Sequence, residues 1–331
     1  MRLPLRLALA VVAGLAAGVI CYDALQARGE LAADYTWVWR GAREVLSGRN
    51  PYHDPRLDPA NPYPWNAPLY YPLPAVLLVA PLAWLPAHLS AAVFTALSVG
   101  LLAFAASREG WPHWLILLSP SCYRAATEGH WAPLVVALAL LPGLAPLTAA
   151  LKPNLGAAVG LTRWSWRGVG ITAAIGSASL LALPSWPLDW LHNLGAHRHS
   201  IPLLVSPAAL VLLLAALAWR ERAARLLLLM ALVPQRLIWS DQLPLHLVPA
   251  TLPQQLTLLA TSWVGYLVWR VGLHEIHSVR TFDDVSGPLV LLSVYLPALA
   301  VVLWQQRAAL RAALPRRYSP PTGTDSMPSS K

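Results

Sequence analysis

Long apolar runs separated by short polar turns fill most of this chain. About 20 apolar residues are enough for a helix to cross a lipid bilayer, and the first run covers residues 5–25. Further apolar runs follow at about 69–85, 88–106, 144–161, 169–183, 207–219, 256–271 and 288–303. The pattern predicts an all-α polytopic integral membrane protein with roughly 9–11 membrane segments.

One long polar and aromatic stretch, at about residues 27–70, interrupts this pattern after the first run. Its residues 35–46 alternate as in an amphipathic helix. Asp34 stands before them as a preferred N-cap, and Gly48 follows them as a helix terminator. The sequence Asn50-Pro51-Tyr52 then predicts a turn that folds the loop back.

Arginines mark the sides of the membrane. Clusters at residues 163–167 and 220–225 indicate the cytoplasmic face, because Lys and Arg are enriched there. We therefore expect residues 1–304 to form one transmembrane domain of the plasma membrane, with the long first loop outside the cell. Residues 305–331 are basic and rich in Ser and Pro, which predicts a disordered cytoplasmic tail.

Composition supports the membrane class. The chain is 56% hydrophobic and 12% charged, whereas soluble domains carry about 25% charged residues. The net charge of +9 comes from arginines placed between apolar runs, so membrane lipids rather than nucleic acid are the expected partners. Cys21 and Cys122 are isolated in apolar surroundings, and we expect them to be inert core residues.

Five short motifs follow one another along the chain. They are Asp34 with Ala42-Arg43, Leu46 and Gly48-Arg-Asn-Pro-Tyr52; Tyr70-Tyr-Pro-Leu-Pro74 with Ala80–Pro86; Gly129-His130; Lys152-Pro153; and Trp239-Ser-Asp241-Gln242. In this order they resemble glycosyltransferase family 87 across most of residues 30–250. His130 stands where that family often has Gln, and the last motif is one residue shorter than its counterpart.

The resemblance implies a C-type glycosyltransferase fold and an inverting reaction on the extracytoplasmic side. It implies a polyprenyl-phosphate sugar donor of the mannose or arabinofuranose class, and a glycolipid or glycan acceptor. No Asp-x-Asp motif occurs in the first loop, so neither a metal nor another cofactor is expected.

Sugar transfer needs a base for the acceptor hydroxyl and a cation for the departing phosphate. Asp34 is the candidate catalytic base, and the alternative is that it only caps the helix behind it. Lys152 is the candidate phosphate ligand, because a charge within an apolar run costs about 2.5–3.5 kcal/mol and usually marks function. Its alternative role is to reach an interface with its charged end.

Two further polar residues have a functional and a structural interpretation. Arg124 could bind phosphate as a planar fork, or form an internal ion pair with Glu128. His130 could donate a hydrogen bond to phosphate or polarise a hydroxyl, or serve only the structure.

The remaining candidates would contact the sugar. Asp241 and Gln242 could bind its hydroxyls, or could cap and border a loop. Trp37 and Tyr52 could stack on a sugar face or hold the prenyl chain, although an aromatic belt at the membrane interface also explains such residues.

The sequence thus predicts a membrane glycosyltransferase, and two other classes remain open. A transporter or flippase of a lipid-linked or small substrate would show internal repeats with paired broken helices, and no convincing repeat is evident. A non-catalytic relative would keep the fold without an accessible site around Asp34.

Overall fold

The computed structural model describes residues 3–53, 68–195, 200–272 and 279–313. The middle of the first loop and the chain beyond residue 313 lie outside these ranges. The described α-helices are α1 (Leu3–Arg28), α2 (Ala33–Leu46), α3 (Leu73–Val79), α4 (Ala87–Glu109), α5 (Pro120–Glu128), α6 (Ala132–Leu140), α7 (Leu147–Leu151), α8 (Pro153–Thr162), α9 (Trp166–Ala182), α10 (Trp186–Leu194), α11 (Arg222–Leu232), α12 (Leu252–Gly272), α13 (Val279–Val290) and α14 (Leu296–Ala313).

Five 3-10 helices and one π-helix lie between these α-helices in the described ranges. The 3-10 helices are η2 (Ala80–Leu82), η3 (Trp111–Leu118), η4 (Pro202–Leu204), η5 (Pro207–Ala218) and η6 (Ser240–Leu247), and the π-helix is η7 (Leu291–Tyr295). Within the described ranges the only β pairing is one isolated bridge between Ser200 and Gln235. The predicted all-α class is therefore confirmed.

Three helical stretches are long and apolar enough to cross a membrane: α1, α4 and Val285–Arg307. The pair α9 and α10 would add a fourth span if its two arms, bent by 99°, count as one. These helices are compatible with a helical membrane protein. The count of roughly 9–11 segments stays a prediction, because the other described helices are shorter or broken.

The two N-terminal candidate spans, α1 and α4, pack closely through small residues. A Cβ atom added at Gly14 would lie 2.5 Å from the carbonyl oxygen of Ala96, and one at Gly100 would lie 3.1 Å from that of Ala10. Only glycine permits such backbone contact, which is a common way for apolar helices to associate in lipid.

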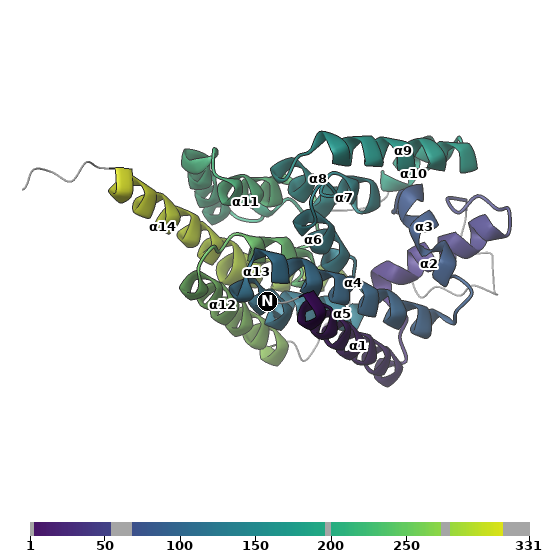
Figure 1. The fold of residues 1–331 in the computed structure, drawn as a ribbon, viewed down its shortest axis with the longest axis horizontal. Helices are drawn as coiled ribbons and strands as arrows, with labels where there is room; N and C mark the ends of the chain where they lie inside the picture. Colours follow the sequence, from purple (N-terminus) through teal and green to yellow (C-terminus); the bar gives the residue numbers. More distant parts are fainter. Residues whose placement is uncertain (1–2, 54–67, 196–199, 273–278, 314–331) are drawn as a thin grey trace, which may run out of the picture.

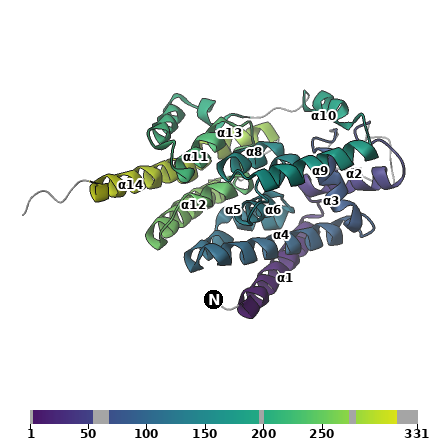
Figure 2. The ribbon, with the colours of Figure 1, turned by 45° about the horizontal axis from the view of Figure 1, so that its top comes forward.

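Short helices fill the space between longer ones. Helices α1 and α4 lie on one side of the molecule and α9 on the opposite side, with α6 between α4 and α9 (Figures 1 and 2). Helices α2, α3 and α10 gather at one end, whereas α14 projects from the other (Figure 1). The chain therefore turns many times, and some of these turns bring polar residues at a helix end, such as Lys152 and Asp241, into the interior.

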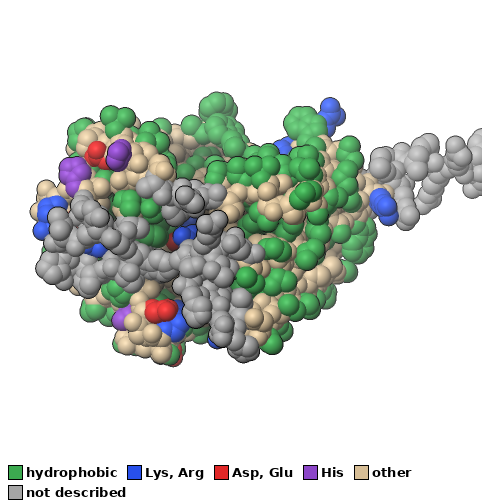
Figure 3. Space-filling model, turned by 180° about the vertical axis from the view of Figure 1, so that it is seen from behind, with side chains coloured by type: hydrophobic (Ala, Val, Ile, Leu, Met, Phe, Trp, Pro, Cys, Tyr) green, Lys and Arg blue, Asp and Glu red, His purple; other side chains and the backbone are tan. Residues whose placement is uncertain are grey.

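The surface carries large apolar side chains, including Val12, Leu97, Leu181 and Val264, each of which is more than half exposed. Hydrophobic side chains cover much of the face in Figure 3, and charged and histidine side chains gather toward one end of it. Such extended apolar surface is unusual for a water-soluble monomer. It fits a protein surrounded by lipid.

The C-terminal helix differs from the predicted boundary. Helix α14 continues through Gln305, where the disordered tail was expected to begin, and ends at Ala313. The extension is rich in Ala, Leu and Arg, which are strong helix formers. The predicted start of the tail at 305 is therefore wrong for residues 305–313, and its remainder lies outside the described residues.

Candidate functional site

Four polar residues from distant parts of the chain meet in one cluster. Asp34 Oδ2 lies 2.6 Å from Lys152 Nζ and 2.8 Å from His130 Nε2. Asp241 Oδ1 lies 3.0 Å from His130 Nε2 and 3.3 Å from Lys152 Nζ. All four were predicted site residues, and the structure brings them together; we refer to them as the Asp34 cluster.

Asp34 lies in the first turn of α2, but it is not the N-cap residue of that helix. The helix starts at Ala33 with Ala32 as the N-cap residue, which makes no side-chain capping bond. The predicted N-cap role of Asp34 is therefore wrong, because its carboxylate is drawn to Lys152 and His130 instead. Its place in the first turn still favours a negative charge, since the backbone N–H groups of a helix start carry partial positive charge.

His130 follows a glycine that ends α5. Gly129 has φ +63°, and a Cβ atom there would lie 2.9 Å from the Cβ of Ala32. The glycine thus lets the start of α2 approach His130. The backbone nitrogen of Ala132 lies 3.1 Å from His130 Nδ1, and Nε2 faces the carboxylates.

Lys152 occupies the break between α7 and α8. Its backbone is extended (φ −140°, ψ 86°), and Pro153 starts the next helix. The two helices touch at Gly156, where an added Cβ would lie 2.0 Å from the carbonyl oxygen of Thr148. The hydroxyl of Thr148 donates to the carbonyl of Gly156 at 2.9 Å. This sharp connection directs the ammonium group inward.

Asp241 lies in the first turn of η6, and its neighbour Gln242 organises the preceding loop. The amide Nε2 of Gln242 donates to the Gln235 side chain and to the backbone carbonyls of Arg236 and Ile238, at 3.1–3.2 Å. Gln242 is fully buried, so the alternative that it borders the loop as a rim residue is wrong, and it organises the loop from inside instead. Its predicted sugar contact remains a prediction.

The Asp34 cluster is buried unevenly. The side chains of His130, Lys152 and Asp241 are 4%, 8% and 4% exposed, whereas that of Asp34 is 23% exposed. Asp34 is therefore the member most accessible to a ligand. Its contacts with Lys152 and His130 both fall on Oδ2; among the described residues, no donor contacts Oδ1.

Charge in the cluster is nearly balanced. Two carboxylates face the Lys152 ammonium and His130. Burial and the charge of Lys152 lower the pKa of His130, but Asp34 and Asp241 outweigh both and raise it above its usual 6.5, so a protonated ring balances the second carboxylate. Burial raises the pKa of Asp34, but the charges of Lys152 and His130 and their hydrogen bonds outweigh burial and hold that pKa well below its usual 3.8. Asp34 is thus ionised at neutral pH.

Aromatic side chains surround the cluster. The Lys152 ammonium lies 5.8 Å from the centre of the Tyr71 ring, and Tyr71 packs on the fully buried Trp131. Trp37, one turn after Asp34 on α2, meets Tyr70 edge to face at 5.5 Å. Trp37 is half-buried beside the site, and its stacking role remains a prediction.

Tyr52 stabilises the first loop through hydrogen bonds. Its hydroxyl donates to the carbonyl of Tyr71 at 3.0 Å, and its own backbone N–H donates to the Asn50 side chain. The turn predicted at residues 50–52 is therefore present. Helix α10 braces this turn, because Asn193 donates to the carbonyls of Tyr52 and Leu69.

Arg124 lies in a separate ion pair. Its guanidinium pairs with Glu128 one turn later on α5 and lies 5.4 Å from the centre of the Trp269 ring. The internal ion pair that the sequence allowed is thus confirmed. A phosphate contact by Arg124 remains a prediction.

Sequence inspection gave no role to Arg236. This half-buried residue lies near Tyr70: burial raises the pKa of Tyr70, and the charge of Arg236 opposes that rise. Among the described side chains, no carboxylate lies within ion-pair distance of Arg236. Its position five residues before Asp241, in a polar break of the apolar pattern, was the available signal.

A metal site is not built from these side chains. Within the described ranges, no group of three His, Cys, Asp or Glu residues is arranged to hold a metal ion. In the Asp34 cluster the Lys152 ammonium occupies the space between the two carboxylates.

In comparisons with known proteins, the chain matches no family model, no curated protein and no solved structure.

Proposed function

We propose that this chain is an inverting membrane glycosyltransferase of the C-type, which moves a sugar of the mannose or arabinofuranose class from a polyprenyl phosphate to a lipid or glycan acceptor. The observation that carries the proposal is the convergence of Asp34, His130, Lys152 and Asp241. Buried charges in an apolar protein are costly and usually mark function. Here the most exposed member is the proposed base.

The chemistry follows from the placement of Asp34. The acceptor hydroxyl oxygen forms a bond to C1 of the sugar, while the bond from C1 to the phosphate oxygen breaks and its electron pair leaves with the phosphate. Asp34 Oδ1 accepts the hydroxyl proton. Lys152 and His130 hold Oδ2 and thereby fix the direction of the carboxylate.

The departing phosphate needs a cation that is not already neutralised. Lys152 is shared between two carboxylates, so its charge is already compensated before a phosphate approaches. Arg236 lies near Tyr70, which packs on Trp37 one turn from Asp34. We therefore assign the phosphate contact to Arg236, and to Lys152 the task of orienting Asp34.

The test uses the purified full-length protein with polyprenyl-phosphate mannose or arabinofuranose, and measures prenyl phosphate released together with glycosylated acceptor. Asp34→Asn should lower the rate by at least about 100-fold, as expected for a lost general base. Glu30→Gln is the matched control, because Glu30 is an exposed acid whose ion pair among the described residues is with Arg28. Transfer at the wild-type rate by the Asn variant would refute the assignment.

A transporter is the second candidate. The observation in its favour is the 99° break between α9 and α10, because broken helices form the binding sites of many transporters. Flux of lipid-linked sugar into proteoliposomes, without any glycosylated product and unaffected by Asp34→Asn, would favour it. A non-catalytic relative would show neither flux nor transfer.

A further inference from the structure

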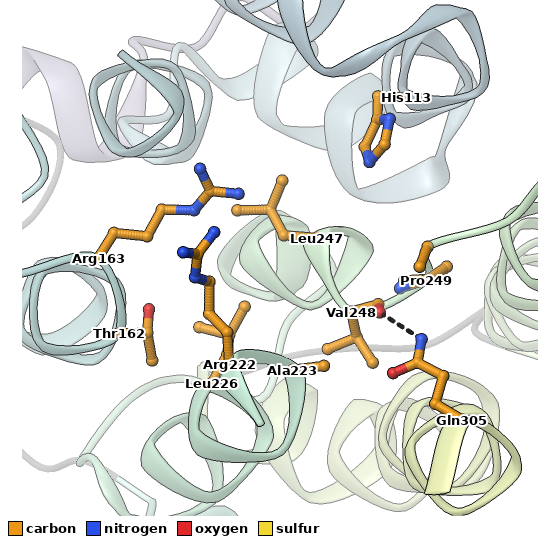
Figure 4. A pocket seen from close by; sticks show the side chains of 11 residues that line it. His113, Thr162, Arg163, Arg222, Ala223, Leu226, Leu247, Val248, Pro249 and Gln305 are labelled. Carbon is orange, nitrogen blue, oxygen red and sulfur yellow. Dashed lines mark hydrogen bonds between the residues drawn. The ribbon is translucent and has the colours of Figure 1, made fainter. Parts of the chain in front are cut away.

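A second polar hollow lies away from the Asp34 cluster and shares no residue with it. It has a volume of about 170 Å³ and lies between η3, the end of α8, the start of α11 and α14. Figure 4 shows the guanidinium groups of Arg163 and Arg222 side by side at one end of this hollow, with His113 across from them. We call it the Arg163 pocket.

The Arg163 pocket has more positive than negative charge. Arg163 Nη1 lies 3.3 Å from Glu109 Oε1, and both side chains are partly exposed. Within the described part of the chain, no carboxylate lies within ion-pair distance of Arg222. Of the two guanidiniums only that of Arg163 is paired with an acid, and a bound anion would relieve the repulsion between them.

Neutral groups in the pocket add polar contacts. The Nδ1 atom of His113 is buried, and within the described ranges it has no hydrogen-bond partner. Thr162 and Gln305 also line the pocket, but their donors are already used, because Thr162 donates to the carbonyl of Val159 at 2.8 Å and Gln305 donates to that of Val248 at 3.1 Å (Figure 4). An oxyanion in the pocket could thus receive hydrogen bonds from the two arginines, with the His113 ring as a further polar group beside it.

The surroundings indicate where that anion comes from. Leu226 and Leu247 form apolar walls, and Trp164 and Trp166, beside Arg163 in sequence, are more than half exposed. Exposed Trp next to Arg is typical of the interface between membrane and water. Basic pockets between helices at such interfaces bind lipid head groups.

We propose that the Arg163 pocket binds the phosphate of an anionic membrane lipid, held by Arg163 and Arg222. Arginine suits this ligand because its planar fork donates two parallel hydrogen bonds to phosphate oxygens. The site would anchor the junction of α8, α11 and α14 to the membrane surface. This proposal is independent of the proposed glycosyltransferase reaction.

The test is titration of the detergent-purified full chain with short-chain phosphatidic acid, short-chain phosphatidylcholine and inorganic phosphate, read as a shift in thermal midpoint. We expect phosphatidic acid to bind at least about tenfold more tightly than either of the others. Arg222→Gln should weaken phosphatidic acid binding by at least about tenfold. Arg220→Gln is the matched control, because Arg220 is an exposed neighbour outside the pocket.

Each result decides the proposal. Equal binding of inorganic phosphate and phosphatidic acid would refute the lipid source. Equal binding of all ligands by the Arg222 and Arg220 variants would refute the site. Arg222→Lys keeps the charge without the fork and should retain part of the affinity, so it separates a phosphate contact from a loss of folding, which the midpoint without ligand also reports.

Discussion

Lys152 Nζ lies between Asp34 Oδ2, at 2.6 Å, and Asp241 Oδ1, at 3.3 Å. One ammonium thus lies between two carboxylates that come from helix starts more than 200 residues apart in the chain. His130 bridges the same two oxygens through Nε2. Removal of either carboxylate leaves Lys152 paired with the other, whereas removal of the lysine leaves two like charges close together.

Stability should therefore respond unequally to substitutions in the Asp34 cluster. Lys152→Met removes the ammonium between the two carboxylates and should cost about 3–5 kcal/mol of unfolding free energy. Asp241→Asn keeps the pair of Lys152 with Asp34 and should cost about 1–3 kcal/mol. The measurement is the thermal midpoint in detergent.

The double variant Lys152→Met with Asp241→Asn provides the control. It removes one cation and one anion, so it should be more stable than Lys152→Met alone, because neighbouring charges couple non-additively. Strictly additive losses would show that the carboxylates do not interact through Lys152.

The pH dependence of activity should depend on the same lysine. Lys152 and His130 hold the pKa of Asp34 well below 3.8 despite burial, so ionised Asp34 contributes stability above about pH 3.8 that is lost as pH falls through the lower folded pKa. In Lys152→Met, burial still raises the pKa of Asp34, but the charge of Lys152 that lowers this pKa is gone. The acid limb of kcat/KM should then rise by at least about one pH unit.

Lys152→Arg is the control for that profile, because it retains the positive charge. Its acid limb should stay near that of the wild type even if its maximal rate falls. An unchanged acid limb in Lys152→Met would mean that Lys152 does not set the protonation of Asp34.

Much of this arrangement was visible in the sequence. The apolar runs predicted the helices. The four members of the Asp34 cluster were each part of a motif that resembles glycosyltransferase family 87, and Lys152 was also noted as a charge within an apolar run. Their meeting was not predictable by periodicity, because each sits where a helix begins or ends, and such breaks depend on tertiary contacts. Asp34 shows the limit: its sequence context favoured an N-cap, yet its ion pair with Lys152 decided its role.

The position of Arg236 near the site could not be predicted from the sequence for a related reason. In sequence it is one more arginine among apolar residues, and only its nearness to Tyr70 distinguishes it from the arginines at the other helix ends. The lengths of the short helices could not be predicted from the sequence either. Proline and glycine at positions such as Pro153 and Gly129 indicate breaks, but the angles between the resulting pieces follow from close contacts like that of Gly156 with Thr148.

The contact of Gly129 with α2 can be tested by a matched pair of glycine substitutions. Gly129 and Gly29 have nearly the same left-handed backbone, with φ +63° and +62°, but an added Cβ meets Ala32 at 2.9 Å only at Gly129. Both alanine variants should lose about 1–2 kcal/mol to backbone strain. Gly129→Ala should lose more, because the start of α2 must move away from His130.

Activity separates these two variants further. Displacement of Asp34 from His130 should lower kcat in Gly129→Ala, whereas Gly29→Ala should keep a kcat close to that of the wild type. Equal rates and equal thermal midpoints in the two variants would show that the close approach of Gly129 to Ala32 does not position the site.

Arg236 offers a test of how the donor is held. A half-buried guanidinium near Tyr70, without a carboxylate in ion-pair distance among the described residues, has its charge available for a ligand. Arg236→Gln should raise the KM for polyprenyl-phosphate sugar at least about tenfold, as expected for a lost charge-assisted contact to phosphate. Arg270→Gln, at an exposed position in the last turn of α12, is the control and should leave KM unchanged. Because the contact also stabilises the departing phosphate, kcat should fall as well, and a donor analogue that ends in a neutral phosphotriester should lose the distinction between wild type and Arg236→Gln. If the two proteins still differed with that analogue, Arg236 would support the fold near Tyr70 rather than hold the phosphate.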